Sequence, residues 1–249
     1  MNQWLPESTL PGFVPTLNAT GWMTLHLDPI SEAFVEFAAQ CGSECLDIGC
    51  AYGVATLPAL ARGARMLACD MEERHLQILQ RRTPDEHRNL LRVQTAMLPA
   101  VNFPAHSFGA ILCSRALHFL RGPDITTSVQ LMAKWLKPGG RLFLVADSPF
   151  GGPWASRAAD YERRKAAGDP WPAFVSSFLD LLPPDADPAQ HPKFINPLDP
   201  DILRREVEAS GLRTIECRWL PGFQPGSPPN IRAGVVAARR NAYDESNLP

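Results

Sequence analysis

The stretch LDIGCAYG, residues 46–53, decides the fold expected for this chain. It continues a short apolar run and is followed by the helical pattern VATLPALARG at 54–63, which predicts a strand, a glycine-containing turn and a helix. In a parallel α/β sheet such a turn lies at the carboxyl edge of the strands, where ligands bind. The stretch therefore predicts a ligand site at this edge.

The glycines of this turn stand at 49 and 53, and Ala51 lies between them. This spacing does not match the dinucleotide pattern G-x-G-x-x-G, and no Gly-Lys-Ser/Thr follows, which excludes a P-loop. Asp47 would repel a pyrophosphate but favour a cationic ligand, such as the ammonium and sulfonium of S-adenosylmethionine. Asp47 could instead simply cap the next turn. Ala51 suits the loop only if its φ is negative.

Helical periodicity alternates with short apolar runs from residue 31 to about 146, which predicts βα units feeding a parallel sheet. Strands are expected at 44–48, 65–70, 89–96, 109–117 and 141–147, and helices at 29–41, 54–63, 71–82 and 124–137. Asp28 and Pro29 suit the start of the first helix, and Gly42 its end. A tight turn is expected at 138–140, Pro-Gly-Gly.

Beyond Asp147 the chain becomes rich in proline up to residue 200. Aromatic residues at 154, 171, 174, 178 and 194 make this segment too apolar for a disordered linker. We expect an ordered lid with one helix at 154–168. A last helix at 199–211 and strands at 213–220 and 233–240 would complete the sheet. The whole chain is expected to be one domain: a cap at 1–30, a core at 31–147, the lid at 148–200 and final elements at 201–240.

Composition narrows the classes of partner. With 24 basic and 26 acidic residues, the chain has no general charge that would attract nucleic acid or acidic lipid. Its six cysteines form no C-x-x-C pair, which predicts a reduced, cytoplasmic protein without a metal site. The N-terminus lacks a signal-peptide pattern, and no apolar run approaches ~18 residues, so no membrane span is expected. The oligomeric state stays open.

Four motifs in order resemble those of class I S-adenosylmethionine-dependent methyltransferases. They are LDIGCAYG, the ACD that ends at Asp70, SFGAILCSRALHFL at 107–120 and WLKPGGRLFLVAD at 135–147. The resemblance covers about residues 30–147 by motif, and the final helix and strands by order. It implies a doubly wound, mostly parallel seven-stranded Rossmann-like sheet with an antiparallel last strand and a proline-rich insertion after the fifth strand. It also implies S-adenosylmethionine as cofactor.

The resemblance assigns cofactor contacts residue by residue. Asp70 would accept hydrogen bonds from the ribose hydroxyls, although it could also cap the helix that follows, and Met71 would lie against adenine. Many relatives carry an acid on the third strand, but this chain reads VQTAMLP at 93–99. Backbone groups near Ala96 and Met97 would then hold adenine, with Gln94 as a substitute acceptor. The cofactor contacts expected in full are Asp47, Gly49, Ala51, Gly53, Asp70, Met71, Gln94, Ala96, Met97 and Ser114.

On the acceptor side, His118 follows the fourth strand and has the ordinary pKa of a base, or it serves packing and orientation. Tyr161 is a second candidate catalytic residue. Trp154, Tyr161 and His26 are the expected substrate contacts, and Trp171 and His191 lie in the same insertion as the first two. Trp22 and His26 could also fold over the cofactor as an N-terminal cap. These aromatic residues could equally anchor the insertion, and those at 22 and 26 could form a hydrophobic staple.

The sequence therefore predicts methyl transfer from S-adenosylmethionine to an oxygen or nitrogen of a small, partly apolar acceptor. A nucleic-acid acceptor is not expected, because the lid carries no basic cluster. A protein or carrier-bound acceptor is the alternative substrate. A non-catalytic cofactor-binding or regulatory module is the alternative to an enzyme, and Ala51 and the missing third-strand acid keep that alternative open.

Overall fold

The computed structural model describes residues 4–18, 20–224 and 226–241. The strands are β1 (Phe13–Pro15), β2 (Trp22–Thr24), β3 (Cys45–Ile48), β4 (Met66–Asp70), β5 (Leu91–Thr95), β6 (Phe108–Ser114), β7 (Leu136–Asp147), β8 (Arg213–Leu220) and β9 (Arg232–Ala238). The helices are α1 (Pro29–Gln40), α2 (Thr56–Ala61), α3 (Glu73–Arg82), α4 (Gly122–Trp135), α5 (Ala158–Ala166) and α6 (Pro200–Ala209).

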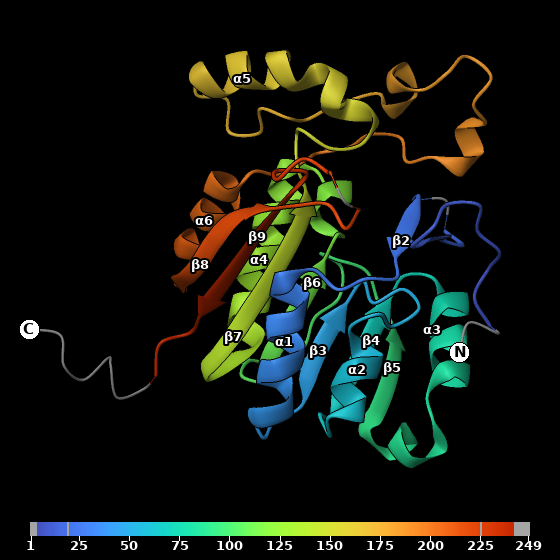
Figure 1. Cartoon of the computed structure of the whole chain (residues 1–249). Helices are drawn as coiled ribbons and strands as arrows, with labels where there is room; N and C mark the ends of the chain where they lie inside the picture. Colours follow the sequence, from blue (N-terminus) through green and yellow to red (C-terminus); the bar gives the residue numbers. More distant parts are fainter. Residues whose placement is uncertain (1–3, 19, 225, 242–249) are drawn as a thin grey trace, which may run out of the picture.

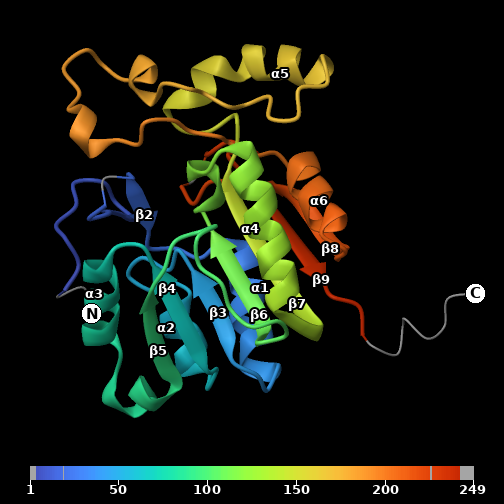
Figure 2. The same cartoon turned by 180° about the vertical axis from the view of Figure 1, so that it is seen from behind.

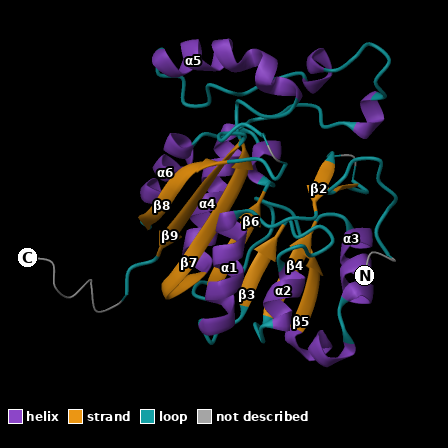
Figure 3. Ribbon diagram, in the orientation of Figure 1, coloured by secondary structure: helices purple, strands orange, loops and turns teal. Residues whose placement is uncertain are grey.

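Seven of the strands form one sheet in the order β5-β4-β3-β6-β7-β9-β8 (Figures 1 and 3). Strands β3 to β7 run parallel to one another, and β9 runs antiparallel between β7 and β8. The expected doubly wound sheet with an antiparallel last strand is therefore confirmed.

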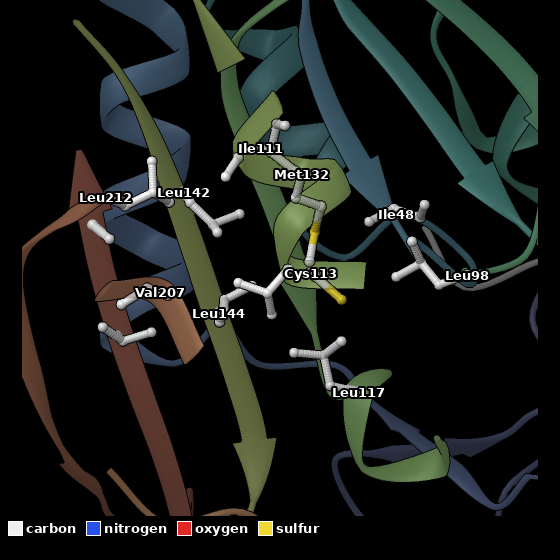
Figure 4. Close-up of a cluster of buried hydrophobic side chains, with 14 of the residues drawn as sticks. Ile48, Leu98, Ile111, Cys113, Leu117, Met132, Leu142, Leu144, Val207 and Leu212 are labelled. Carbon is white, nitrogen blue, oxygen red and sulfur yellow. The ribbon is translucent and has the colours of Figure 1, made fainter. Parts of the chain in front are cut away.

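Two helical layers enclose the sheet, with α1, α2 and α3 on one face and α4 and α6 on the other (Figures 1 and 2). Along β6, Ala110 and Leu112 belong to the cluster with α1, whereas Ile111 and Cys113 belong to the cluster with α4. Figure 4 shows the second cluster, in which Met132 of α4 lies beside these side chains. A strand covered on both faces needs a continuous apolar run, which explains the sequence pattern.

Helix starts follow local capping chemistry. The Asp28 carboxylate accepts hydrogen bonds from the amides of Ile30 and Ser31 at the start of α1. Asp199 does the same for Ile202 in α6, and each helix has proline in its first turn. These two starts lie where the sequence predicts them.

Two local features differ from expectation. The turn expected at 138–140 lies inside β7, because α4 already ends at Trp135. The strand bulges there: Phe108 of β6 pairs with Leu136 but Ala110 pairs with Arg141, and Gly139 has a φ of +75°. The amide of Gly139 donates to Arg239 O and the amide of Arg239 donates to Gly140 O, so the bend is paired with the chain after β9. The hairpin β1–β2 was not predicted, since each strand has three residues.

The insertion after β7 crosses above the carboxyl ends of the parallel strands, and the N-terminal segment lies over the same edge (Figures 1 and 2). A bridge between Val175 and Ile195 ties the insertion to itself. The Trp171 indole packs directly over Gly122, where a Cβ atom would overlap it, and Arg205 stacks on the indole at 4.8 Å. These contacts fix the insertion onto α4 and α6.

Candidate functional site

A cavity of about 870 Å³ lies between this edge of the sheet and the two segments above it. Residues at the ends of β3, β4, β6 and β7 form its floor, and residues 10–24 and 151–195 contribute to its walls. The side chains that the sheet edge presents to the cavity come from the carboxyl ends of these strands and from the loops that follow, which is the position of ligand sites in doubly wound folds.

Asp47 is the residue before the last of β3 and lines the cavity, and its Oδ2 accepts a hydrogen bond of 2.6 Å from the Thr56 hydroxyl. Burial raises the pKa of Asp47 to about 7; the Thr56 hydrogen bond opposes this shift and the Asp70 charge adds to it. A cationic ligand beside Asp47 would stabilise the ionised form of this buried carboxyl group.

The glycine loop departs from one expectation. Ala51 has a φ of +45°, so the prediction of a negative φ there is wrong. Its amide donates a hydrogen bond of 2.8 Å to Oδ2 of Asp70, which holds the alanine in the left-handed region. Gly49 is required for space as well, because a Cβ atom there would lie 2.9 Å from Cβ of Ala116. Gly53 faces Leu79 instead of the cavity, so its expected cofactor contact is not supported.

Asp70 ends β4, caps the start of the helix that follows and also lines the cavity. Its Oδ1 accepts from the amide of Glu72 and from Nδ1 of His75, which orders the start of α3. Its Oδ2 accepts from the amide of Ala51 and lines the cavity. A carboxylate has about four acceptor positions, so roughly one is left for a ligand. Asp70 can therefore receive one ribose hydroxyl directly, where two were expected.

His75 was missed by the sequence reasoning. Its Nε2 accepts a hydrogen bond of 2.9 Å from the amide of Leu17, while its Nδ1 lies 3.0 Å from Oδ1 of Asp70. The ring is buried and packs edge-on against Tyr52. His75 thus connects the N-terminal segment to the acidic residue of β4. The feature of the sequence that could have identified His75 is its place in the first turn of α3, from which its side chain can reach back to the end of β4.

The adenine side of the predicted site is partly supported. Met71, Ala96 and Met97 line the cavity, and the two methionine side chains are each 51% exposed. Such exposed apolar surface at a cavity is typical of ligand contact. Gln94 does not line the cavity and is exposed on the edge strand β5, so its predicted role as an adenine acceptor is wrong.

A charged cluster stands at the ends of β6, β7 and β9. Arg115 Nε and Nη2 lie 3.0 and 3.2 Å from the two oxygens of Asp147, and Arg232 Nε lies 3.8 Å from Oδ1. Burial alone would raise the pKa of Asp147, but Arg115 and the other neighbours lower it to about 2. Arg115 also has a φ of +58°, a strained conformation that is often found at functional sites. Ser114, expected as a cofactor contact, also lines the cavity.

His118 is buried in the same cluster and lines the cavity. Its Nδ1 accepts a hydrogen bond of 3.1 Å from the amide of Asp147, so in the neutral ring the proton is on Nε2. Burial lowers the pKa of His118 to about 4, despite the nearby Asp147 carboxylate. The ring is therefore neutral at pH 7 and has no free lone pair, which fits orientation better than base catalysis.

The remaining acceptor-side candidates divide in two groups. Trp154, Trp22 and His191 line the cavity, and the Trp154 indole donates to Ser148 O at 2.7 Å. Tyr161 does not line it, because its hydroxyl donates to Asp199 at 2.7 Å and ties α5 to the start of α6. His26 is exposed beside Phe223, outside the cavity. The predicted acceptor contacts of Tyr161 and His26 are therefore not supported.

Two further properties concern the described part of the chain. Its helices include none with the length and apolar character needed to cross a membrane. Over residues 4–18, 20–224 and 226–241, no three His, Cys, Asp or Glu side chains are grouped as metal ligands would be.

Comparison with known proteins connects this geometry to a family. Residues 45–140 match the family described as a methyltransferase domain. A ubiquinone biosynthesis O-methyltransferase of Idiomarina loihiensis is 28% identical over 122 residues, which are 48% of this chain and 49% of that protein. The chain thus spans about half the length of the curated relatives it matches.

Solved structures show the same fold over most of the chain. A SAM-dependent methyltransferase from Methanosarcina mazei superposes with a TM-score of 0.62 at 16% identity, over 86% of this chain and 99% of that one. One from Mesorhizobium loti gives 0.59 at 16% identity, over 85% and 96%. Residues 45–140 therefore match a methyltransferase domain, and the chain as a whole shares the fold of S-adenosylmethionine-dependent methyltransferases of known structure.

Proposed function

We propose that this chain transfers a methyl group from S-adenosylmethionine to an oxygen or nitrogen of a small, partly apolar acceptor. The observation that carries the proposal is the placement of Asp47 and Asp70, at the ends of adjacent strands, on the floor of one cavity. The cavity continues from these two carboxylates to the ends of β6 and β7, which leaves space for a second molecule.

The residues present fit the cofactor. Asp47 offers a buried negative charge for its ammonium and sulfonium end, and Asp70 has an acceptor position for a ribose hydroxyl. Met71, Ala96 and Met97 offer an apolar surface for adenine. When bound, the cofactor supplies a methyl group on a positively charged sulfur. The protein's part is to align the acceptor with that methyl and to exclude water.

The insertion supports a small and partly apolar acceptor. Trp154, Phe178 and Ile195 pack together into a buried cluster that borders the cavity. A wall of this kind excludes water and recognises apolar surface. The curated relatives are named O-methyltransferases, which favours oxygen over nitrogen as the acceptor atom.

Calorimetry with S-adenosylmethionine and S-adenosylhomocysteine tests the cofactor assignment. Asp70→Asn should weaken binding at least tenfold, because the Asn side-chain NH₂ cannot accept a hydrogen bond. A 2′-deoxy or 3′-deoxy analogue should lose affinity in the wild type but lose no more in the variant, if one hydroxyl pairs with Asp70. Asp85→Asn, at a highly exposed position in an ion pair with Arg88, is the matched control.

Release of S-adenosylhomocysteine, measured over a panel of phenols, alcohols, carboxylates and amines, tests the transfer itself. Turnover with one of these small molecules supports the proposed function. Cofactor binding with turnover on a purified carrier protein alone would contradict the small acceptor. Absence of cofactor binding would overturn the enzyme assignment and leave the non-catalytic module.

A further inference from the structure

The two halves of the cavity carry opposite charge. Among the described residues that line it, Asp47 and Asp70 are the charged groups over β3 and β4. The other half, over β6, β7 and the insertion, has Arg115, Arg232 and Lys193 against the single carboxylate of Asp147. The acidic half suits a cationic cofactor. The basic half must suit the second molecule, and a surplus of guanidinium favours an anion.

Arg232 is a buried cation in this half with unused hydrogen-bonding capacity. It is 3% exposed, its Nη1 donates to Pro221 O at 3.2 Å, and its guanidinium stacks 4.0 Å over the Phe223 ring. Within the described residues its Nε is buried without a hydrogen-bond partner. Burial is the largest cause that lowers the pKa of Arg232, to about 10, so it is still charged at neutral pH.

The nearby carboxylates are bound to other groups and form no hydrogen bond with the Arg232 guanidinium. Asp147 binds Arg115 through both oxygens and lies 3.8 Å from Arg232 Nε, beyond hydrogen-bond distance. Asp28 also acts on Arg232, but its oxygens accept from two amides and the Ser31 hydroxyl at the positive end of α1. A desolvated guanidinium with an unmade hydrogen bond is costly unless a ligand completes it.

The neighbouring histidines bear on the chemistry of the acceptor. His118 is neutral and its Nδ1 is occupied by the Asp147 amide, so it cannot take a proton from an acceptor. His191 belongs to the insertion and stacks on Phe178. An alcohol or ammonium would need a base before methylation, whereas a carboxylate is already ionised at neutral pH and needs none.

From these observations we infer that the acceptor is a carboxylic acid with an apolar body, bound as its carboxylate by Arg232 and methylated on a carboxylate oxygen. This rests on the proposed function. One carboxylate oxygen bonds to the methyl carbon while the methyl–sulfur bond breaks, and the electron pair of that bond stays on sulfur. An anion and a sulfonium thus give a neutral ester and a thioether, with no proton to remove. Trp154 and Phe178 would contact the apolar body.

Ligands matched in chain length test the inference on the protein saturated with S-adenosylhomocysteine. Decanoate, decan-1-ol and decylamine are compared by calorimetry at pH 8 and low salt. Decanoate should bind at least tenfold more tightly than the other two. Arg232→Met should remove that preference and leave decan-1-ol binding unchanged. Arg232→Lys should keep part of it, because the charge remains but the planar fork is lost. Arg88→Met, at an exposed arginine, is the matched control.

With S-adenosylmethionine, mass spectrometry should detect methyl decanoate from the wild type and at least tenfold less from Arg232→Met. Equal affinity for the three ligands, preference for the amine, or a full decanoate preference in Arg232→Met would overturn the inference. If Arg232→Met does not fold, the wild-type ligand series and Arg232→Lys decide. Failure of the proposed function gives different results: either S-adenosylhomocysteine itself does not bind, or turnover occurs only on a carrier protein.

Discussion

The backbone amide of Ala51 donates a hydrogen bond of 2.8 Å to Oδ2 of Asp70, joining the loop after β3 to the end of β4. The acceptor of this bond is the carboxylate that faces the proposed ribose position. The bond also holds Ala51 at a φ of +45°, which costs an alanine roughly 1–2 kcal/mol. The loop conformation and the proposed ribose contact thus depend on the same side chain.

Ala51→Gly should stabilise the protein. Removing the left-handed strain gains roughly 1–2 kcal/mol, and glycine loses roughly 0.5–1 kcal/mol in chain entropy. The free energy of unfolding should therefore rise by roughly 0.5–1 kcal/mol. Urea unfolding measures it. Ala159→Gly, at an exposed position of α5, is the matched control and should destabilise by about 1 kcal/mol. A loss in both variants would show that Ala51 is not strained.

Asp47 should make the stability of the free protein depend on pH. Its pKa is raised from the ordinary 3.8 to about 7, so between these values the folded state keeps a proton that the unfolded chain has lost. This contribution is complete below about pH 4 and is lost as pH rises to 7. Asp47→Asn should remove it, as measured by denaturant unfolding from pH 4.5 to 8. Parallel curves for wild type and variant would contradict the buried, protonated carboxyl group.

Cofactor binding should release a proton for the same reason. A cation beside Asp47 favours the carboxylate, so affinity should rise with pH up to about 7 and then level off. Calorimetry in buffers of different ionisation enthalpy counts the protons released at pH 6. Cofactor binding to Asp47→Asn should release fewer protons. An equal number in the variant would show that the proton comes from another group.

His118→Asn should retain turnover within about tenfold of the wild type, since asparagine can still accept from the Asp147 amide; loss of a general base costs about 10²–10⁴. His118→Phe cannot accept that bond and should lose more. The pKa of about 4 also means that His118 stabilises the fold above the ordinary pKa of 6.5, and this stability is lost as pH falls to 4. A rate loss of about 10³-fold in His118→Asn, together with loss of one limb of the pH–rate profile, would show that His118 acts as a general base.

Tyr161→Phe should lower the free energy of unfolding by about 1 kcal/mol, because the hydrogen bond to Asp199 is lost. Affinities for S-adenosylhomocysteine and decanoate should not change, since Tyr161 does not line the cavity. Thermal unfolding and calorimetry on the same preparation check both parts. Weaker decanoate binding without a loss of stability would show that Tyr161 contacts the acceptor.

Much of the cofactor half of the site was predictable because it is built from single loops. Asp47, Gly49 and Ala51 lie at the end of one strand and in its loop, and Asp70 and Met71 lie at the end of the next, so strand order alone brings them to one edge. The positive φ of Ala51 was not predictable, because it depends on the hydrogen bond to Asp70, 19 positions away. The error at Gln94 has a similar origin, since the edge position of β5 exposes it.

The acceptor half could not be predicted in this way. Arg115, Asp147 and Arg232 come from three strands, and the cluster forms because β9 inserts beside β7 and aligns Asp147 with Arg232. The aromatic residues of the insertion were recognised as a group, but their composition did not separate Trp154, which lines the cavity, from Tyr161, which anchors α5.

The sequence by itself determined the sheet, its two helical layers and the acidic edge, because strand runs, caps and loop residues act over a few neighbouring positions. The tertiary structure decided the left-handed conformation of Ala51, the occupied lone pair of His118 and the unpaired buried nitrogen of Arg232. Each of these depends on contacts between segments far apart in the chain, and burial then sets the cost of every charge and hydrogen bond there.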